Sequence, residues 1–352
     1  MENNKKTTDN VLEVVNLKKY FPIKAGVMQR VVGHVKAVDD VSFTIGRGKT
    51  FALVGESGCG KTTIGRTVLR LVEPTAGKAI IDGVDIFAIN NKEELRKMRS
   101  KMQIIFQDPY SSLNPRIPVG EIIGEAVREH NIVPKEEYND YILRTMDECG
   151  LRPYYRGRYP HEFSGGQRQR ICIARALALK PDLIIADEPV SALDVSIQAQ
   201  IINLLKDLQE TRGISYLFIS HDLSVVEYIA DNVGVMYLGN IVETAPKEEL
   251  FKHPCHPYTK ALLSAVPVPN PDSKMNRVIL SGDIPSPANP PSGCKFHSRC
   301  KYCMDVCKKQ QPELVDYGNG HFIACHLYSG GNVDTDIDAE YAKRTQPTEN
   351  KE

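Results

Sequence analysis

The stretch Gly55-Glu-Ser-Gly-Cys-Gly-Lys-Thr62 decides the fold, because it matches the pattern G-x-x-x-x-G-K-[ST] of a phosphate-binding loop. Residues 50–54 before it read as a short buried strand, and residues 63–70 after it read as a helix. This order of strand, loop and helix directs backbone N–H groups and a helix N-terminus at an anion. Lys61 is expected to reach the β- and γ-phosphates of a nucleotide, and the Thr62 hydroxyl to bind Mg²⁺. The residues expected to contact the nucleotide or its metal here are Gly55, Glu56, Ser57, Gly58, Cys59, Gly60, Lys61, Thr62 and Thr63.

A pair of acids indicates where hydrolytic chemistry would take place. Residues 183–186 form an apolar run typical of a parallel strand covered on both faces, and Asp187 and Glu188 follow it directly. Ligands of open α/β sheets bind at such carboxyl ends. Asp187 is therefore expected to hold Mg²⁺, and Glu188 to orient or deprotonate the attacking water. The alternative is a structural acid pair that caps Ser191 or a helix. His221 also follows a strand, but taken alone a histidine there is more often a capping or core residue.

Composition narrows the class of protein. The 352 residues are enough for two or more domains. Lys plus Arg and Asp plus Glu both number 44, so no global charge attracts nucleic acid. The longest apolar runs are far shorter than the ~20 residues that cross a membrane, and residues 1–6 lack the apolar core of a signal peptide. We therefore expect a cytosolic protein that binds no nucleic acid.

Two segments flank the phosphate loop and its acids. Residues 11–17 and 36–45 have strand patterns and predict an antiparallel flap in front of the loop. Tyr20, between them, either stacks on a purine ring or packs under the sheet. Residues 110–160 contain several prolines among short helical patterns, which predicts a mostly helical subdomain inserted into the α/β core. Ser164 is a suitable N-cap for the helix that follows.

Together these motifs resemble the ATP-binding cassette of ABC transporters over about residues 11–250. Phe163 stands where leucine is usual before the signature serine, and this apolar replacement puts little in doubt. The resemblance implies an α/β P-loop NTPase fold with a RecA-like core, an antiparallel β flap and an inserted helical subdomain at about 108–175. The motifs occur in family order: the phosphate loop, Gln107, Ser164-Gly-Gly-Gln167, Ala186-Asp-Glu188, Ser191-Ala-Leu-Asp194 and His221.

The same resemblance assigns roles to individual residues, because two cassettes of this family face each other head to tail. Ser164, Gly165, Gly166 and Gln167 would contact the ATP bound to the partner's phosphate loop. Gln107 would sense Mg²⁺ and contact the membrane subunit, and Asp194 would link the two sites. His221 would contact the γ-phosphate, and Tyr20 becomes the expected adenine-stacking residue.

Four further stretches resemble the ATPase subunits of oligopeptide and dipeptide permeases: residues 107–116, 159–163, 187–196 and 253–263. The resemblance implies an ATPase that powers peptide import from the cytoplasmic face of the cell membrane. Its implied partners are a second, different ATPase subunit, two transmembrane permease subunits and an extracellular or periplasmic peptide-binding protein. Cargo could instead be nickel, glutathione or an oligosaccharide. A soluble cassette of DNA repair or translation fits poorly, because Thr62 and Ser164 are only 102 positions apart and the chain has one cassette.

Beyond the cassette we expect a small Cys-rich extension at 251–328, with disordered segments at 1–10 and 329–352. Five of the nine cysteines occur between residues 294 and 325, and the spacing C-x5-C-x6-C-x17-C is neither that of a zinc ribbon nor that of a ferredoxin. Spacing alone favours a metal centre only slightly over reduced thiols. The permease resemblance implies a [4Fe–4S] cluster, with Zn²⁺, bound with help from His297 or His326, as the alternative. The ligands expected are Cys294, Cys300, Cys307 and Cys325, with Cys303 outside the set.

Overall fold

The structure is a computed structural model that describes residues 9–266 and 278–328. Our expectations for residues 1–8 and for the tail at 329–352 therefore lie outside the described residues, as does the middle of the proline-rich linker. Asn10, which we expected in the N-terminal segment, already begins a strand. No helix in the described part of the chain is long and apolar enough to span a membrane.

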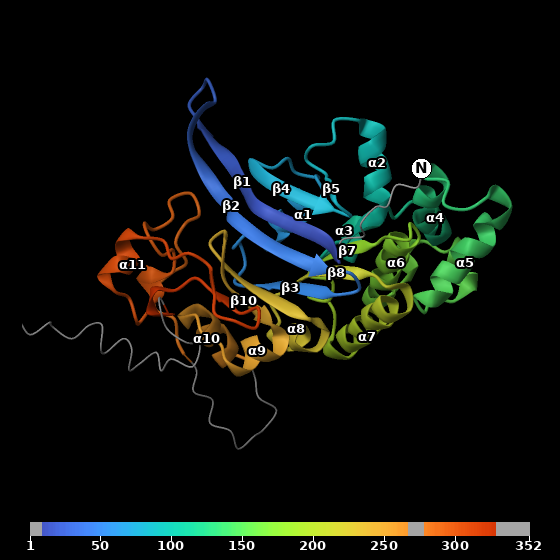
Figure 1. Cartoon of the computed structure of the whole chain (residues 1–352). Helices are drawn as coiled ribbons and strands as arrows, with labels where there is room; N and C mark the ends of the chain where they lie inside the picture. The colour runs from blue at the N-terminus through green and yellow to red at the C-terminus, as the bar shows by residue number, and fades with distance from the viewer. Residues whose placement is uncertain (1–8, 267–277, 329–352) are drawn as a thin grey trace, which may run out of the picture.

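The centre of the molecule is an eight-stranded sheet (Figure 1). In spatial order it comprises β11 (Val315–Asp316), β12 (Phe322–Ile323), β10 (Asn240–Pro246), β9 (Asn232–Tyr237), β3 (Thr50–Val54), β8 (Ser215–Ile219), β7 (Leu183–Asp187) and β6 (Met102–Ile105). The strands from β9 to β6 are parallel, and β10, β12 and β11 join antiparallel. Every residue of β3, β7 and β8 is buried, as their apolar runs predict for parallel strands covered on both faces.

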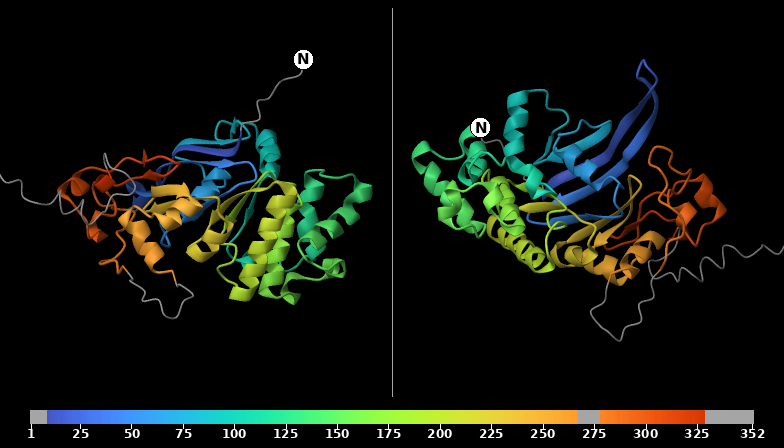
Figure 2. Two further views of the ribbon diagram at one scale, coloured as in Figure 1. Left: turned by 60° about the horizontal axis from the view of Figure 1, so that its bottom comes forward. Right: turned by 180° about the vertical axis from the view of Figure 1, so that it is seen from behind.

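A four-stranded antiparallel sheet confirms the predicted flap. Its strands are β2 (Arg30–Gly46), β1 (Asn10–Ala25), β4 (Ala76–Ile81) and β5 (Val84–Asp85). The hairpin of β1 and β2 is much longer than we predicted, and its outer end projects from the body of the molecule (Figures 1 and 2). That outer half is largely exposed, so it lacks the one-sided apolar alternation by which a strand is recognised.

Helices cover the central sheet and form the inserted subdomain, which is confirmed. Figures 1 and 2 place the subdomain helices at the opposite end of the molecule from the C-terminal extension. The α-helices up to residue 230 are α1 (Lys61–Val68), α2 (Lys92–Lys101), α3 (Pro109–Ser112), α4 (Val119–Glu129), α5 (Tyr138–Glu148), α6 (Gly165–Leu177), α7 (Val195–Arg212) and α8 (Leu223–Ile229). Short 3-10 helices lie at Lys135–Glu137, Pro153–Gly157, Pro160–Glu162, His297–Arg299 and His326–Tyr328.

The C-terminal segment packs directly on the cassette. It contains α9 (Lys247–Lys252), α10 (Pro257–Ser264) and α11 (Asp305–Lys309). Its strand β12 pairs with β10, so the central sheet continues into the extension. The buried rings of Tyr237, Tyr258 and Phe296 join the two parts, with ring centroids 4.8–5.4 Å apart. A fully buried Glu243 on β10 also accepts hydrogen bonds from the backbone N–H groups of Cys255 and His256.

Candidate active site

The phosphate loop is held tightly between two strands. It leaves β3 at Val54 and enters α1 at Lys61, with Gly60 as the N-cap residue. Gly55 and Gly60 have φ angles of 147° and 111°. A Cβ atom at Gly55 would lie 2.2 Å from the Met236 carbonyl oxygen, and one at Gly60 would lie 2.1 Å from that of Ala37. Only glycine fits at these two positions, because other residues would require both a positive φ and a displaced backbone.

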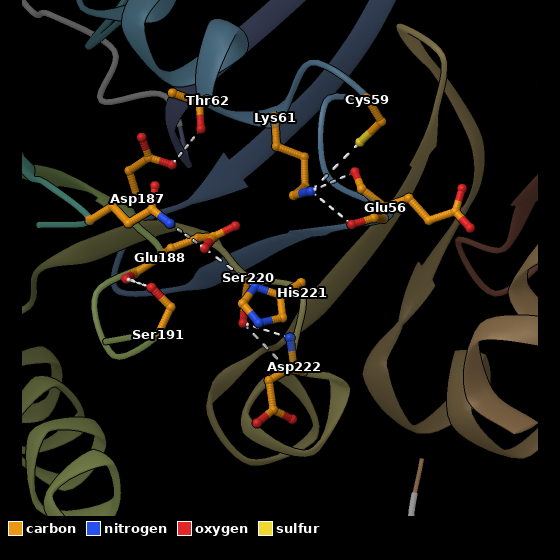
Figure 3. A network of polar contacts seen from close by, with 12 residues as sticks. Glu56, Cys59, Lys61, Thr62, Asp187, Glu188, Ser191, Ser220, His221 and Asp222 are labelled. Carbon is orange, nitrogen blue, oxygen red and sulfur yellow. Dashed lines mark hydrogen bonds and ion pairs between the residues drawn. The ribbon is translucent and has the colours of Figure 1, made fainter. Parts of the chain in front are cut away.

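Lys61 is folded back over this loop (Figure 3). Its Nζ donates to the carbonyl oxygens of Gly55 at 2.7 Å and Glu56 at 3.1 Å. The side chain is buried, so its charge lies in the concave face of the loop, where backbone N–H groups also favour an anion. The phosphate-binding role of Lys61 stays a prediction.

Thr62 and Asp187 meet at the start of α1. The Thr62 hydroxyl donates to Asp187 Oδ1 at 2.8 Å, and Asp187 is the last residue of β7. Burial raises the pKa of the Asp187 carboxyl above its usual value, and the hydrogen bond from Thr62 partly offsets that effect. An adjacent hydroxyl and carboxylate are hard oxygen donors of the kind that Mg²⁺ prefers, so these two residues fit the ion expected here.

Two side chains, which follow the strands on either side of β7, reach Glu188; Figure 3 shows Glu188 and His221. Gln107 Nε2 donates to Glu188 Oε2 at 2.8 Å, and His221 Nδ1 lies 3.3 Å from the same oxygen. Glu188 adopts a φ of 48°, which is costly for a residue with a side chain. Its N–H is bonded to the Ile219 carbonyl on β8, which fixes this conformation. The residues alone predicted only the acid pair at this strand end, and the family resemblance added Gln107 and His221; the structure brings these two beside Glu188.

A cleft of about 420 Å³ contains most of these groups. Its lining also includes residues that sequence reasoning missed, from β2, from the turn after β9 and from the extension. Of these, only Gly239 gave a local signal, because a glycine followed by Asn240 is typical of a turn; in the structure it has a positive φ. The lining residues are Val35, Lys36, Ala37, Ser57, Gly58, Cys59, Gly60, Lys61, Thr62, Thr63, Gln107, Glu188, His221, Gly239 and Pro287. A larger groove of about 1040 Å³, between the flap and the extension, includes none of the predicted catalytic residues.

Tyr20 does not line the cleft. Its hydroxyl donates to Asp39, whose carboxylate also accepts from Lys295 of the extension. Successive side chains of a strand lie on opposite faces, so the ring of the next residue, Phe21, lies on the face of β1 opposite to that of Tyr20. Phe21 is 38% exposed and pairs across the hairpin with Val35, which lines the cleft. The adenine-stacking role of Tyr20 stays a prediction, and Phe21 is a second candidate.

The signature segment lies outside the chain's own cleft. Ser164 caps α6, accepting from the Gln167 N–H at 3.4 Å while Gln167 Oε1 accepts from the Ser164 N–H at 3.1 Å. A Cβ atom at Gly166 would lie 2.5 Å from Ile197 of α7, the helix that Asp194 begins. The signature glycine Gly166 therefore packs against α7, and the signature residues do not line the cleft of the same chain.

The four cysteines predicted as ligands line one small cavity in the extension. Cys303 is not among the lining residues, whereas His297 and His326 are. Burial, with a smaller effect of the neighbouring thiols, raises the pKa of Cys294 to about 11 and that of Cys300 to about 12. In the described part of the chain, the one group of three metal-capable side chains within 4.8 Å of one another is Glu243, Cys255 and His321.

Comparisons with known proteins agree with this geometry. Residues 38–191 match the family model described as ABC transporter, and residues 242–307 match the one described as Oligopeptide/dipeptide transporter, C-terminal region. The chain is 54% identical to the Oligopeptide transport ATP-binding protein AppF of Bacillus subtilis, over 91% of this chain and 98% of that protein. It is 52% identical to the Probable peptide ABC transporter ATP-binding protein y4tS of Sinorhizobium fredii, over 91% and 90% of the two chains.

Two solved structures show the same fold. One is cbiO1 of Clostridium perfringens, part of the ABC transporter complex cbiONQ, with a TM-score of 0.59 and 27% identity over 70% of this chain and 92% of that one. The other is the dimeric ATP-binding cassette MJ0796 bound to ADP and Pi, with a TM-score of 0.59 and 28% identity over 67% of this chain and 98% of that one.

Proposed function

Because this chain belongs to the family of ATP-binding subunits of peptide ABC transporters, we propose that its cleft binds MgATP and that hydrolysis there powers the uptake of dipeptides or oligopeptides. The observation that carries the proposal is the convergence of Gln107 and His221 on Glu188, beside the Thr62–Asp187 pair. A phosphate loop alone would bind a nucleotide. The Glu188 carboxylate, fixed at the same end of the parallel strands, would in addition orient the water that hydrolyses it.

Each residue of the cleft has its own role in the proposed hydrolysis of ATP. The loop N–H groups and Lys61 hold the phosphates, and Thr62 and Asp187 would hold Mg²⁺, which neutralises charge on the departing phosphate oxygens. Glu188 orients a water whose oxygen forms the new bond to the γ-phosphorus, and it accepts the proton that this water loses. The bond between the γ-phosphorus and the bridging oxygen breaks, and its electron pair leaves with ADP. His221 and Gln107 fix the Glu188 carboxylate in position.

The second half of the site would come from another cassette. Ser164 through Gln167 do not line this chain's cleft, which supports a role toward ATP on a partner ATPase subunit. Two transmembrane permease subunits and a peptide-binding protein outside the cell complete the proposed importer, with this chain docked at the cytoplasmic face of the membrane. The names of the similar proteins, which refer to oligopeptide and peptide transport, favour peptides over nickel, glutathione or oligosaccharides as cargo.

For the extension, we propose that Cys294, Cys300, Cys307 and Cys325 hold a [4Fe–4S] cluster, which would crosslink this segment. What supports a single bound group is that all four thiols line one small cavity, which Cys303 does not. Anaerobically purified protein should absorb near about 400 nm and carry about four irons per chain. Colourless protein with stoichiometric zinc would refute the cluster.

Peptide uptake tests the function directly. A strain that lacks this chain should lose uptake of a labelled oligopeptide, and expression of the unaltered chain should restore it. A Lys61→Ala chain expressed at the same level should not restore uptake, because the nucleotide loses its main cation. Fractionation of the same cells should place the chain with membranes. Restoration by Lys61→Ala, or recovery of the chain with ribosomes or DNA, would contradict the proposal.

A further inference from the structure

Glu56, the first variable residue of the phosphate loop, is held by the C-terminal extension. Figure 3 shows its carboxylate directed away from Lys61. Arg299 binds this carboxylate with both ends of its guanidinium, with Nη1 to Oε2 at 2.7 Å and Nη2 to Oε1 at 3.1 Å. The Arg299 side chain is 8% exposed and that of Glu56 is 24% exposed, so water screens this pair only partly. Bidentate pairs of this kind are among the stronger protein hydrogen bonds.

A second contact holds the backbone of the same residue. The Glu56 N–H donates to the Tyr258 hydroxyl at 2.9 Å. Tyr258 lies on α10, is fully buried and packs against Tyr237 and Phe296, so its hydroxyl has a fixed position. Because the Glu56 carbonyl accepts from Lys61 Nζ, the extension holds the residue that in turn holds the phosphate-binding lysine.

We propose that Arg299 and Tyr258 are positioning residues that set the conformation and charge of the phosphate loop through Glu56. The inference rests on nucleotide binding at this loop, as proposed above. Arg299 also neutralises a carboxylate in the loop that must receive a highly charged anion. Without it, Glu56 would repel the phosphates, and the loop would be free to leave the conformation in which its N–H groups converge.

The position of Arg299 in the chain connects the Glu56 contact with the cysteine cavity. It ends the 3-10 helix His297–Arg299, between Cys294 and Cys300, which both line the cysteine cavity. The backbone N–H of His297 donates to the Cys294 carbonyl at 3.0 Å, and that of Cys300 donates to the His297 carbonyl at 3.3 Å. The cysteine cavity and the guanidinium that binds Glu56 are therefore built by one short segment of the chain.

Lys295 provides a matched control. It lies in the same turn as Arg299, its side chain is equally buried at 8% exposure, and it joins the extension to the cassette through Asp39 at 3.1 Å. Asp39 is on β2, not in the phosphate loop. Lys295→Met and Arg299→Met thus each remove one buried cation from the same segment, but only Arg299→Met removes a contact with the loop.

The test measures MgATP affinity of the purified full-length chain by titration calorimetry, with melting temperature recorded for each variant. Arg299→Met should raise the Kd at least tenfold, and Arg299→Lys, which keeps the charge, should restore part of the loss. Tyr258→Phe, which keeps the ring packing, should raise the Kd about three- to tenfold. Lys295→Met should lower the melting temperature and raise the Kd no more than threefold, because Asp39 also binds the Tyr20 hydroxyl but lies outside the phosphate loop.

A double-variant cycle separates positioning from folding. If Arg299 acts through Glu56, Arg299→Met should have little further effect on Kd in a Glu56→Gln chain. An unchanged Kd in Arg299→Met, an equal loss in Lys295→Met, or additive effects in the double variant would each overturn the inference. Failure of the unaltered chain to bind MgATP would instead refute the proposed function, so the two failures are distinguishable.

Discussion

Glu188 is the residue on which the proposed chemistry depends most. Its carboxylate accepts from Gln107, and its backbone is held in a costly conformation, so a glutamine of the same shape should occupy the same place. We expect Glu188→Gln to lower ATP hydrolysis by about 10²–10⁴-fold, because an amide does not accept the proton of the attacking water. MgATP affinity should change less than about threefold, since this residue is assigned to the water, not to the phosphates.

Asp182, just before the same strand, provides a control for this result. Asp182 precedes β7 at the end opposite Glu188, and its side chain is 42% exposed. Asp182→Asn makes the same carboxylate-to-amide change away from the cleft and should leave hydrolysis unchanged. Near-normal turnover in Glu188→Gln, measured as phosphate release, would show that another group activates the water.

Tyr20 and Phe21 offer a second test at the scale of single residues. The Tyr20 hydroxyl is bound to Asp39, whereas Phe21 faces the other side of β1 and remains partly exposed. We predict that Phe21→Ala weakens MgATP binding by about 1–2 kcal/mol, the cost of losing one base–aromatic contact. Tyr20→Phe, which removes only the hydroxyl, should leave the affinity within twofold. If Tyr20→Ala weakens binding and Phe21→Ala does not, the original assignment of Tyr20 is correct.

The helix α10 begins at a buried, neutral histidine. The His256 side chain caps this helix by accepting from the Tyr258 N–H at 3.1 Å. Burial lowers the pKa of His256 to about 4, whereas the unfolded chain should titrate near about 6.5. Because the folded pKa is the lower one, the stabilising contribution is complete above pH 6.5. It is lost as the pH falls toward 4, and its full size is about 3 kcal/mol.

Replacing the cap isolates this effect. His256→Asn keeps a side-chain acceptor at the N-cap but has no titrating group in this range. We expect the variant to melt at a lower temperature at pH 7.5, because a smaller side chain leaves space in the core. Between pH 6.5 and 4 it should then lose less stability than the unaltered chain. Parallel curves of melting temperature against pH would show that His256 does not titrate in this way.

Local motifs and long-range contacts differed in how far the sequence could predict them. The strand, loop and helix around Lys61 were predictable because each depends on adjacent residues, and the carboxyl-end rule for parallel strands placed Asp187 and Glu188 at the ligand-binding end of the sheet. The pairing of β12 with β10 was not, since a strand of two residues has no periodicity. Nor was the Arg299–Glu56 pair, whose partners are 243 residues apart, because an arginine or glutamate by itself does not indicate its partner.

In the molecule as a whole, the phosphate loop and the signature residues do not share a cleft. The phosphate loop lies at the edge of the central sheet, and the signature residues lie at the start of α6, outside the cleft. Under the proposed function, a chain organised in this way would bind a nucleotide alone and would need a second cassette to enclose it. The solved relative MJ0796 is described as dimeric with ADP and Pi bound, which agrees with such an arrangement in the family.

This separation predicts that binding and hydrolysis respond differently to two variants. In the isolated chain, Lys61→Ala should raise the Kd for MgATP at least tenfold, whereas Ser164→Ala should leave it within twofold, because Ser164 lies outside the cleft. In the assembled transporter, Ser164→Ala should still lower ATP hydrolysis at least tenfold, since the partner's site loses a phosphate contact.

Ser164 also caps α6, and losing a cap costs about 1 kcal/mol of stability. Asn91→Ala removes the comparable cap of α2, where the Asn91 side chain accepts from the Glu93 N–H at 2.8 Å, and should leave hydrolysis unchanged. If Ser164→Ala weakens binding in the isolated chain as much as Lys61→Ala does, the signature acts within its own chain and the composite site is wrong.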